Sequence, residues 1–407
     1  MHLYDWPLIF VLVGLIFYTV LGGADFGAGM WQLTAGRGPE GERIRDYAHH
    51  SMAPVWEANH VWLIFVLTVT WTSYPVAFGS IASTLSIPLF LAALGLILRG
   101  AAYALRSGAR TPLETRRTDT VFAVSSLLTP FALGTCIGAI ACRRVPVGNA
   151  AGHLFSSWLN GTSVMIGVLA VLSSAYLAAV YLSADAARQG DPELVRAFRS
   201  RALTAGVLAG AAAVAGVIVI HGNAPLLYHG LTHGGGLVAL LVSFAAGIAA
   251  LSLVRLGRFE PARYVAALAV ASVIAGWALA QEPTFLPHLT VARAAAPRDT
   301  LVLVVVSVLA GALILFPSLA LLFRLFLGGH LGGTPGAADQ GQPLVPDAFR
   351  PLREARSTNA RVAVAAFLAG LILLVFADAW WAQAIGVICL FACVVVGFAA
   401  VGPADMA

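Results

Sequence analysis

The sequence contains no lysine: the 24 basic residues among its 407 are all arginine, and only 11% of the residues are charged. Soluble domains carry about 25% charged residues, so a chain this poor in charge cannot present a sufficiently polar surface to water. The mean hydropathy of +0.86 and the 59% share of hydrophobic residues indicate that lipid surrounds most of the chain. The scarcity of charge therefore excludes an ordinary soluble globular protein.

Several chemical signatures are also missing. The four cysteines form no CxxC, CxxCH or zinc-ligand spacing, so we expect them to be small packing residues. No GxxxxGK[ST] or GxGxxG motif is present, which argues against nucleotide hydrolysis and dinucleotide binding by this chain. The net charge of +5 does not indicate a nucleic-acid partner, because arginine in a membrane protein collects on one face of the bilayer.

Long apolar runs recur from one end of the sequence to the other. In lipid the backbone must satisfy its own hydrogen bonds, so runs of this length are helices, and the alternating pattern of a membrane β-barrel is absent. The first run lacks a basic leader and is expected to be a retained helix. Eleven segments are predicted, of which the last two form either a hairpin or one broken span: 6–31, 53–73, 76–106, 119–142, 158–184, 202–221, 235–256, 262–281, 300–326, 361–378 and 383–403.

The arginines support this segmentation. The odd-numbered connections hold 19 of them and the even-numbered connections hold only four (Arg143, Arg144, Arg293 and Arg298). A missed or invented helix would scramble this asymmetry. By the positive-inside rule, the odd connections are cytoplasmic and the N-terminus lies outside. We therefore predict a multi-pass protein of the cell membrane.

The fold class that follows is all-α: a polytopic membrane helical bundle of about nine core transmembrane helices plus a C-terminal two-helix extension. Residues 1–330 are the predicted nine-helix body. Residues 331–360, which contain several prolines and a charged stretch, are a predicted flexible cytoplasmic linker. Residues 361–407 are the predicted C-terminal transmembrane hairpin.

Ionisable residues inside the membrane mark candidate functional sites, because each costs several kcal/mol unless it is paired. Asp25 follows a glycine-rich stretch in the first segment, where the small residues favour close helix packing and the carboxylate serves either function or structural pairing. Arg99 lies in the third segment. Its guanidinium either neutralises Asp25 or Glu57, faces a partner subunit, or extends to the cytoplasmic interface.

The second segment opens with Trp56, Glu57, Asn59 and His60. Glu57 and His60 are three residues apart and share a helix face. Such a pair is half of a di-metal carboxylate site, but the sequence offers no second ExxH motif. A buried acid beside a histidine also suits a proton relay, since burial raises a carboxyl pKa and a charged histidine lowers it. An acid in the first turn that is stabilised by the helix dipole is the structural alternative.

At these two segments the sequence resembles a known family. Residues 22–29 (GGADFGAG) are similar to the first-helix D-G-F-D-x-G-x-G signature of subunit II of cytochrome bd-type quinol oxidases. Residues 51–63 (SMAPVWEANHVWL) resemble that family's I-x-P-x-W-[DE]-x-N-x-V-W-L motif, and Arg99 falls where the family has an arginine in its third helix. Gly22 replaces the first acid of the signature, and the similarity ends near residue 330.

The resemblance implies an enzyme subunit of a quinol:O₂ oxidoreductase in a bacterial cell membrane. It implies a partner subunit I that carries haems b and d, with no cofactor held confidently by this chain. Subunit II would stabilise the haem subunit and supply part of a proton path from the cytoplasm. By motif position, Glu57 would be the channel acid, Trp56, Asn59 and Asp25 would line or support the route, and Arg99 would stabilise the interface. A structural quinone and a small accessory subunit are further candidates, as are quinol and membrane lipid as binding partners.

Two other readings stay open from the residues alone. A secondary transporter usually carries binding groups in matching positions of two repeats, whereas the polar groups here cluster in the first three segments. A purely structural scaffold would use Asp25 and Glu57 only for pairing. A histidine group in an outer loop (His221, His229 and His233) is compatible with metal binding, although surface histidines are more common.

Overall fold

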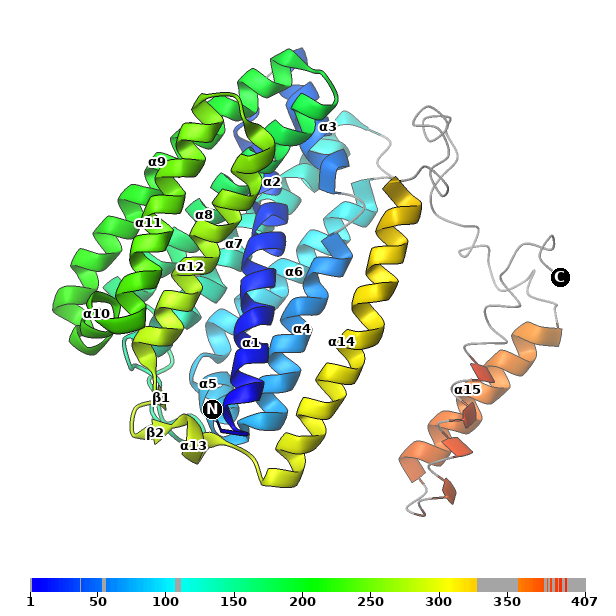
Figure 1. The fold of residues 1–407 in the computed structure, drawn as a ribbon. Helices are drawn as coiled ribbons and strands as arrows, with labels where there is room; N and C mark the ends of the chain where they lie inside the picture. The colour runs from blue at the N-terminus through cyan, green and yellow to red at the C-terminus, as the bar shows by residue number, and fades with distance from the viewer. Residues whose placement is uncertain are drawn as a thin grey trace. The chain divides into compact units, whose positions relative to one another are not determined.

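The computed structural model describes residues 2–36, 38–52, 56–106, 111–327 and 358–376, and nine positions between 379 and 393. Contacts divide the chain into two units, Met1–Leu331 and Gly332–Ala407. The first unit is a bundle of long helices running back and forth between two ends (Figure 1). The domain boundaries predicted from the sequence stay predictions.

The first unit is almost wholly helical. The only sheet among its described residues is a short antiparallel pair, β1 with β2. In chain order its elements are α1 (Asp5–Phe17), the π-helical segment η1 (Tyr18–Gly22), α2 (Gly23–Leu33), α3 (Pro39–Met52), α4 (Trp56–Ser73), α5 (Pro75–Thr84), α6 (Ser86–Arg106), α7 (Pro112–Ala141), α8 (Gly161–Arg188), α9 (Pro192–Asn223), α10 (Pro225–Thr232), α11 (Gly234–Arg255), α12 (Phe259–Gln281), β1 (Thr284–Leu286), β2 (Leu289–Thr290), α13 (Val291–Ala294) and α14 (Arg298–Leu327).

Eight helices within the described ranges are long and apolar enough to cross a membrane, counting α1, η1 and α2 as one span. The predicted all-α membrane bundle is therefore confirmed. The predicted second span, 53–73, is helical as α4, whose first turns hold the polar residues Glu57, Asn59 and His60. Such groups are costly inside a membrane unless they are paired.

Local chemistry sets where several of these helices begin. Proline occupies the first position of α5, α7, α9 and α10, where its missing N–H breaks no intrahelical hydrogen bond. Thr111 and Glu114 form a reciprocal capping box at the start of α7, with both N–H···O distances at 3.2 Å. The Asp191 side chain accepts hydrogen bonds from the first N–H groups of α9.

Glycine lets α2 pack in direct backbone contact with its neighbours. A Cβ at Gly27 would lie 2.0 Å from the main-chain oxygen of Ser174 in α8, and a Cβ at Gly29 would lie 2.2 Å from the Ser126 hydroxyl in α7. Small residues at such spacing are the usual means of close helix approach in membranes. The glycine-rich stretch therefore packs α2, the helix that carries Asp25, closely against α7 and α8.

The structure corrects several segment predictions. Residues 39–52 of the first connection form a polar helix, α3, which lies across one end of the bundle (Figure 1). The predicted third segment, 76–106, is broken at Leu85 into α5 and α6. The predicted start of the sixth segment at 202 is late, because α9 already begins at Pro192 behind the Asp191 cap.

We call the end that holds α3 and the α8–α9 connection the α3 end. The opposite end holds the N-terminus, α5, α10, β1, β2 and α13 (Figure 1). The second unit contains α15 (Thr358–Phe376), which begins in the last three residues of the predicted linker and covers most of the first arm of the predicted C-terminal hairpin. The predicted linker up to residue 357, and most of the second arm, lie outside the described residues.

Candidate functional site

Asp25 of α2 is buried in the body, with only 1% of its surface exposed. The buried Asn59 of α4 donates a hydrogen bond from its side-chain amide to the Asp25 carboxylate. A buried polar group without a partner is costly, so this bond helps to compensate for placing a carboxyl group here. Two residues singled out from different sequence motifs therefore meet directly.

Arg99 of α6 also points into this cluster and is 1% exposed. One terminal nitrogen donates to the main-chain oxygen of Asp25 at 3.0 Å, and the other donates to the Ser126 hydroxyl at 3.1 Å. Its guanidinium carbon also lies 4.8 Å from the ring centre of Phe26 and 4.6 Å from that of Phe122. These contacts exclude the alternative in which Arg99 extends to the interface.

His60 completes the described part of this cluster, together with Tyr18. Its ring centre lies 6.1 Å from that of Tyr18 and 5.9 Å from that of Phe26. Tyr18 opens the π-helical segment η1, which ends three residues before Asp25. A π-helical turn inside a membrane helix shifts the register of all that follows, and such turns are frequent at functional sites. Here it separates the N-terminal part of the span, α1, from the turn that carries Asp25.

Two predicted site residues are placed only by their backbone. Trp56 and Glu57 belong to the first turn of α4, and Glu57 precedes His60 by three residues on that helix. Their side chains lie outside what the structure describes. The roles of Glu57 and Trp56 therefore stay predictions, while Asp25, Asn59, Arg99 and His60 are brought together.

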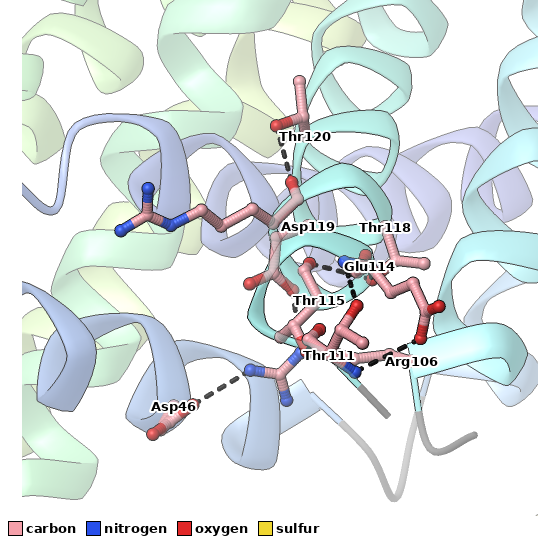
Figure 2. Close-up of polar contacts among 9 residues, drawn as sticks. Asp46, Arg106, Thr111, Glu114, Thr115, Thr118, Asp119 and Thr120 are labelled. Atoms are coloured by element: carbon pink, nitrogen blue, oxygen red, sulfur yellow. Dashed lines mark hydrogen bonds and ion pairs between the residues drawn. The ribbon is translucent and has the colours of Figure 1, made fainter. Parts of the chain in front are cut away.

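A second polar cluster, which the sequence reasoning missed, lies at the α3 end. Arg106 at the end of α6 bonds Asp119 of α7 at 2.7 Å and Asp46 of α3 at 2.9 Å (Figure 2). Arg106 and Asp119 are both mostly buried, with side chains 17% and 15% exposed. One feature of the sequence could have indicated this cluster: the spacing of Arg99, Tyr103 and Arg106 places all three on one face of a helix.

His49 of α3 lies between the two clusters. Its ring stacks on Tyr103 of α6 with centres 5.0 Å apart, and it meets the edge of Phe122 of α7 at 6.1 Å. Phe122 in turn covers the Arg99 guanidinium. Side-chain contacts therefore continue from the buried Asp25 to the α3 end, with the apolar ring of Phe122 between Arg99 and His49.

No group of three or more His, Cys, Asp or Glu side chains within the described ranges is arranged to hold a metal ion. A shallow apolar depression of about 500 Å³ lies between α7 and α8. It presents almost no polar surface, so it suits an acyl or isoprenoid chain and offers nothing to bind a quinone headgroup. Its lining consists of Val124, Leu127, Leu128, Phe131, Val168, Val171 and Leu172.

The chemistry open to the buried cluster is proton exchange. A carboxyl group, an amide and an imidazole can each donate or accept a hydrogen bond, whereas the guanidinium supplies a fixed positive charge. Intramembrane ionisable groups of this kind usually mark ion or proton pathways. No nucleophile–base pair of the kind used in covalent catalysis is found among the described cluster residues.

Comparison with known proteins assigns the body. The family model for cytochrome bd terminal oxidase subunit II matches residues 3–326. The chain is 29% identical over 168 residues to cytochrome bd ubiquinol oxidase subunit 2 of Bacillus subtilis, which covers 40% of this chain and 48% of that protein. It is 27% identical over 173 residues to cytochrome bd-I ubiquinol oxidase subunit 2 of Escherichia coli, covering 41% and 44%. The aligned region thus spans about half the length of these curated relatives.

A solved structure shares the fold. The bd oxidase of Geobacillus thermodenitrificans contains a chain that matches with a TM-score of 0.63 and 23% identity, covering 80% of this chain and 99% of that one. Because the family model covers most of the chain and the helical body agrees with this fold, the protein is a member of the cytochrome bd terminal oxidase subunit II family.

Proposed function

We propose that this chain is the non-haem-bearing membrane subunit of a bacterial quinol:O₂ oxidoreductase. Its membership of the subunit II family carries the proposal. Haems b and d belong to a partner subunit I, which this chain holds in the membrane, and quinol is the electron donor. The scarcity of ionisable groups elsewhere in the spans agrees with a chain that supports the redox centre of another subunit.

This subunit also supplies part of a proton-uptake path from the cytoplasm. The single observation behind this role is the series of contacts that leads from Asp25 through Arg99 and the ring of Phe122 to His49 and Tyr103 at the α3 end. The arginine distribution puts the α3 end on the cytoplasmic side and the N-terminus outside. Reduction of O₂ consumes protons, so a proton inlet that opens at the α3 end would take them up from the cytoplasm.

Each residue has a distinct part in the proposed route. Glu57 and Asp25 hold the transferred proton, and Asn59 orients the Asp25 carboxylate through its hydrogen bond. Arg99 fixes the main chain at Asp25 and provides a positive charge that stabilises the ionised acid. His60 and Trp56 line the same region of α4. The haems, when bound to the partner, supply the electron-transfer chemistry that these residues serve.

The test is quinol-dependent O₂ consumption by the purified complex with Glu57→Gln and Glu57→Ala. We expect activity to fall by about tenfold or more, since loss of one proton-transfer group typically costs 10²- to 10⁴-fold when it is fully required. The haem absorbance and the subunit ratio should stay at wild-type values. Glu282→Gln is the matched control, because this exposed glutamate lies at the opposite end of the bundle.

Other outcomes would separate the alternatives. Full activity in both Glu57 variants would contradict the proton-path role and support the alternative that this subunit is a structural scaffold. If no haem-bearing partner copurifies with the wild-type chain, the oxidase assignment of this protein fails.

A further inference from the structure

We propose that Tyr18 is a further proton-carrying residue of the buried cluster, and that its hydroxyl takes the place of the carboxylate that the family signature has at position 22. This inference rests on the proposed proton-uptake role and extends it by one residue. Gly22 offers no side chain of its own, whereas Tyr18 opens the π-helical segment that ends at Gly22. A tyrosine hydroxyl, like a carboxylic acid, can both donate and accept a hydrogen bond.

The ring of Tyr18 fills the space beside Gly22. A Cβ at Gly22 would lie 3.2 Å from Cε2 and 3.3 Å from Cδ2 of Tyr18, which is tighter than ordinary contact. It would lie 3.8 Å from Cζ, the ring carbon that bears the hydroxyl. A longer side chain at position 22 and the tyrosine ring therefore compete for one place in the bundle. A tyrosine can bring a polar group to this place because position 22 is a glycine.

The Tyr18 ring lies inside the cluster around Asp25. Its centre is 6.1 Å from that of His60, and it meets the Phe26 ring edge to face with centres 6.3 Å apart. The Phe26 ring in turn covers the guanidinium of Arg99. Asp25 and Arg99 are both close enough to act electrostatically on the Tyr18 hydroxyl. The hydroxyl therefore belongs to the same polar environment as the acid.

The hydroxyl is buried without a protein partner. Tyr18 is 5% exposed, and its oxygen meets no hydrogen-bonding group among the residues that the structure describes. The Nε of Arg99 is buried in the same way. Buried polar atoms are rarely left unpaired, and water is their usual partner where the protein supplies none. We therefore expect water to bond the Tyr18 hydroxyl and to connect it with the other polar groups of the cluster.

Tyr18 extends the series of polar groups to the middle of the membrane. It lies close to the middle of the 29-residue span Asp5–Leu33. Asp25 lies roughly two helical turns, or about 10 Å, nearer the α3 end. A proton from Asp25 passes through water to the Tyr18 oxygen while the hydroxyl hydrogen leaves to the next water, so the phenol is neutral before and after. Asp25 is left ionised and takes up its next proton from the α3 end.

The experiment is quinol-dependent O₂ consumption by the purified full-length complex, measured in H₂O and in D₂O. Tyr18→Phe keeps the ring and loses the hydroxyl. We expect activity to fall about three- to tenfold, less than for a proton-transfer group that is fully required. The solvent isotope effect should rise, because proton transfer then limits the rate. The haem absorbance and the unfolding temperature should stay at wild-type values.

Tyr176→Phe is the matched control. Tyr176 of α8 is also 5% exposed, and its hydroxyl also lacks a partner within the described ranges. Its ring packs instead against α9, where a Cβ at Gly206 would lie 2.9 Å from Cε2 of Tyr176. Loss of this hydroxyl should leave both O₂ consumption and the isotope effect unchanged.

A second set of variants tests whether an acid at position 22 can replace the tyrosine. Tyr18→Leu removes the ring and the hydroxyl, which leaves space beside Gly22. Its activity should be at least as low as that of Tyr18→Phe. Tyr18→Leu/Gly22→Asp places a carboxyl group in that space and should recover much of the lost activity, whereas Tyr18→Leu/Gly22→Ala should not.

The proposal is overturned if Tyr18→Phe keeps wild-type activity and isotope effect while Glu57→Gln is impaired, a result that leaves the proposed proton path in place. It is also overturned if activity falls only together with haem content, or if the isotope effect does not change, since the loss would then be structural. Wild-type activity in both Tyr18→Phe and Glu57→Gln would contradict the proton-path role as well.

Discussion

Two regions of the same helical body handle polar groups in opposite ways. In the first region, α2, α4, α6 and α7, the buried residues include Asp25, Asn59, Arg99 and Ser126. In the second region, α9, α11 and α12, the buried side chains are mostly alanine, and Ser272 is the one polar member among the described buried residues. Both regions pack closely, so close packing itself does not require buried charge.

Charge in the second region is kept at the helix ends. Glu260 and Arg263 of α12 form an ion network at the α3 end with Asp185 and Arg188 of the neighbouring α8, with contacts between 2.5 and 3.9 Å. Partly exposed ion pairs of this kind contribute little to stability. The comparison indicates that one part of this bundle packs without intramembrane charge, so close packing alone does not account for the cluster in the first region.

The largest effect on stability should come from adding a side chain where α2 and α8 are in direct backbone contact beside the cluster. In Gly27→Ala, the added methyl would meet the Ser174 main-chain oxygen, forcing α2 away from α8. We expect a loss of more than about 3 kcal/mol, at the upper end of overpacking costs, and little folded protein. Gly210→Ala in α9 is the control, because its Cβ would meet nothing within 4 Å. Equal yields and equal thermal unfolding of the two variants would contradict this packing.

Removing the buried guanidinium should have the next largest effect. Arg99→Met keeps the apolar stem but loses the bonds to Asp25 and Ser126. Hydrogen bonds to charged groups contribute about 1.5–3 kcal/mol each, so we expect destabilisation of about 3 kcal/mol, read from thermal unfolding in detergent. Arg255→Met, at the exposed end of α11, should change little. If Arg99→Met unfolds at the wild-type temperature, the stability of the cluster does not depend on this charge.

Asp25→Asn should affect activity more than stability. An asparagine can still bond with Asn59 and fill the same volume, but it cannot exchange a proton. We expect O₂ consumption to fall about tenfold with normal haem content, which corresponds to about 1.4 kcal/mol in activation free energy. Asp5→Asn, a half-buried first-turn acid of α1 at the opposite end of the bundle, is the control. If both variants keep full activity, Asp25 serves structure alone.

The spans could be predicted because lipid imposes a simple rule: about 20 apolar residues make a helix. The π-helical turn at Tyr18 left no such trace, since it occurs within apolar sequence. The break at Leu85 lies between the small polar residues Thr84 and Ser86, which a count of apolar residues alone does not register. The polar residues of the site could be singled out because burial in lipid is costly. That Asn59 and Arg99 converge on Asp25 depends on how three helices cross, which spacing along one helix does not determine.

The residues at the α3 end were missed for a different reason. Arg106 and Asp119 lie near helix ends, where arginine is expected on the cytoplasmic face whatever its role. α3 itself is polar and lies in what reads as a simple connection. Only the folded structure shows that this helix packs on the end of α6 and places the ring of His49 on that of Tyr103.

The smallest effect on stability should come from the ion pairs that join α3 to α9 in the second region. Arg43 of α3 bonds both Asp191 and Glu193 at the start of α9. The N–H of Leu194 and the Arg43 guanidinium hold the pKa of Asp191 below its ordinary value. A carboxyl group whose pKa is depressed on folding stabilises the protein above its unfolded pKa, and this stabilisation is lost as the pH falls through the folded pKa.

Asp191→Asn should therefore lower the unfolding temperature by at most a few degrees at pH 7, and the difference from wild type should vanish in acid. An asparagine still caps α9, so the measured difference isolates the charge. Glu260→Gln, within the other ion network of the α3 end, serves as the control for general loss of surface charge. A difference that persists at a pH below the folded pKa would show that the cap, and not the bond to α3, depends on Asp191.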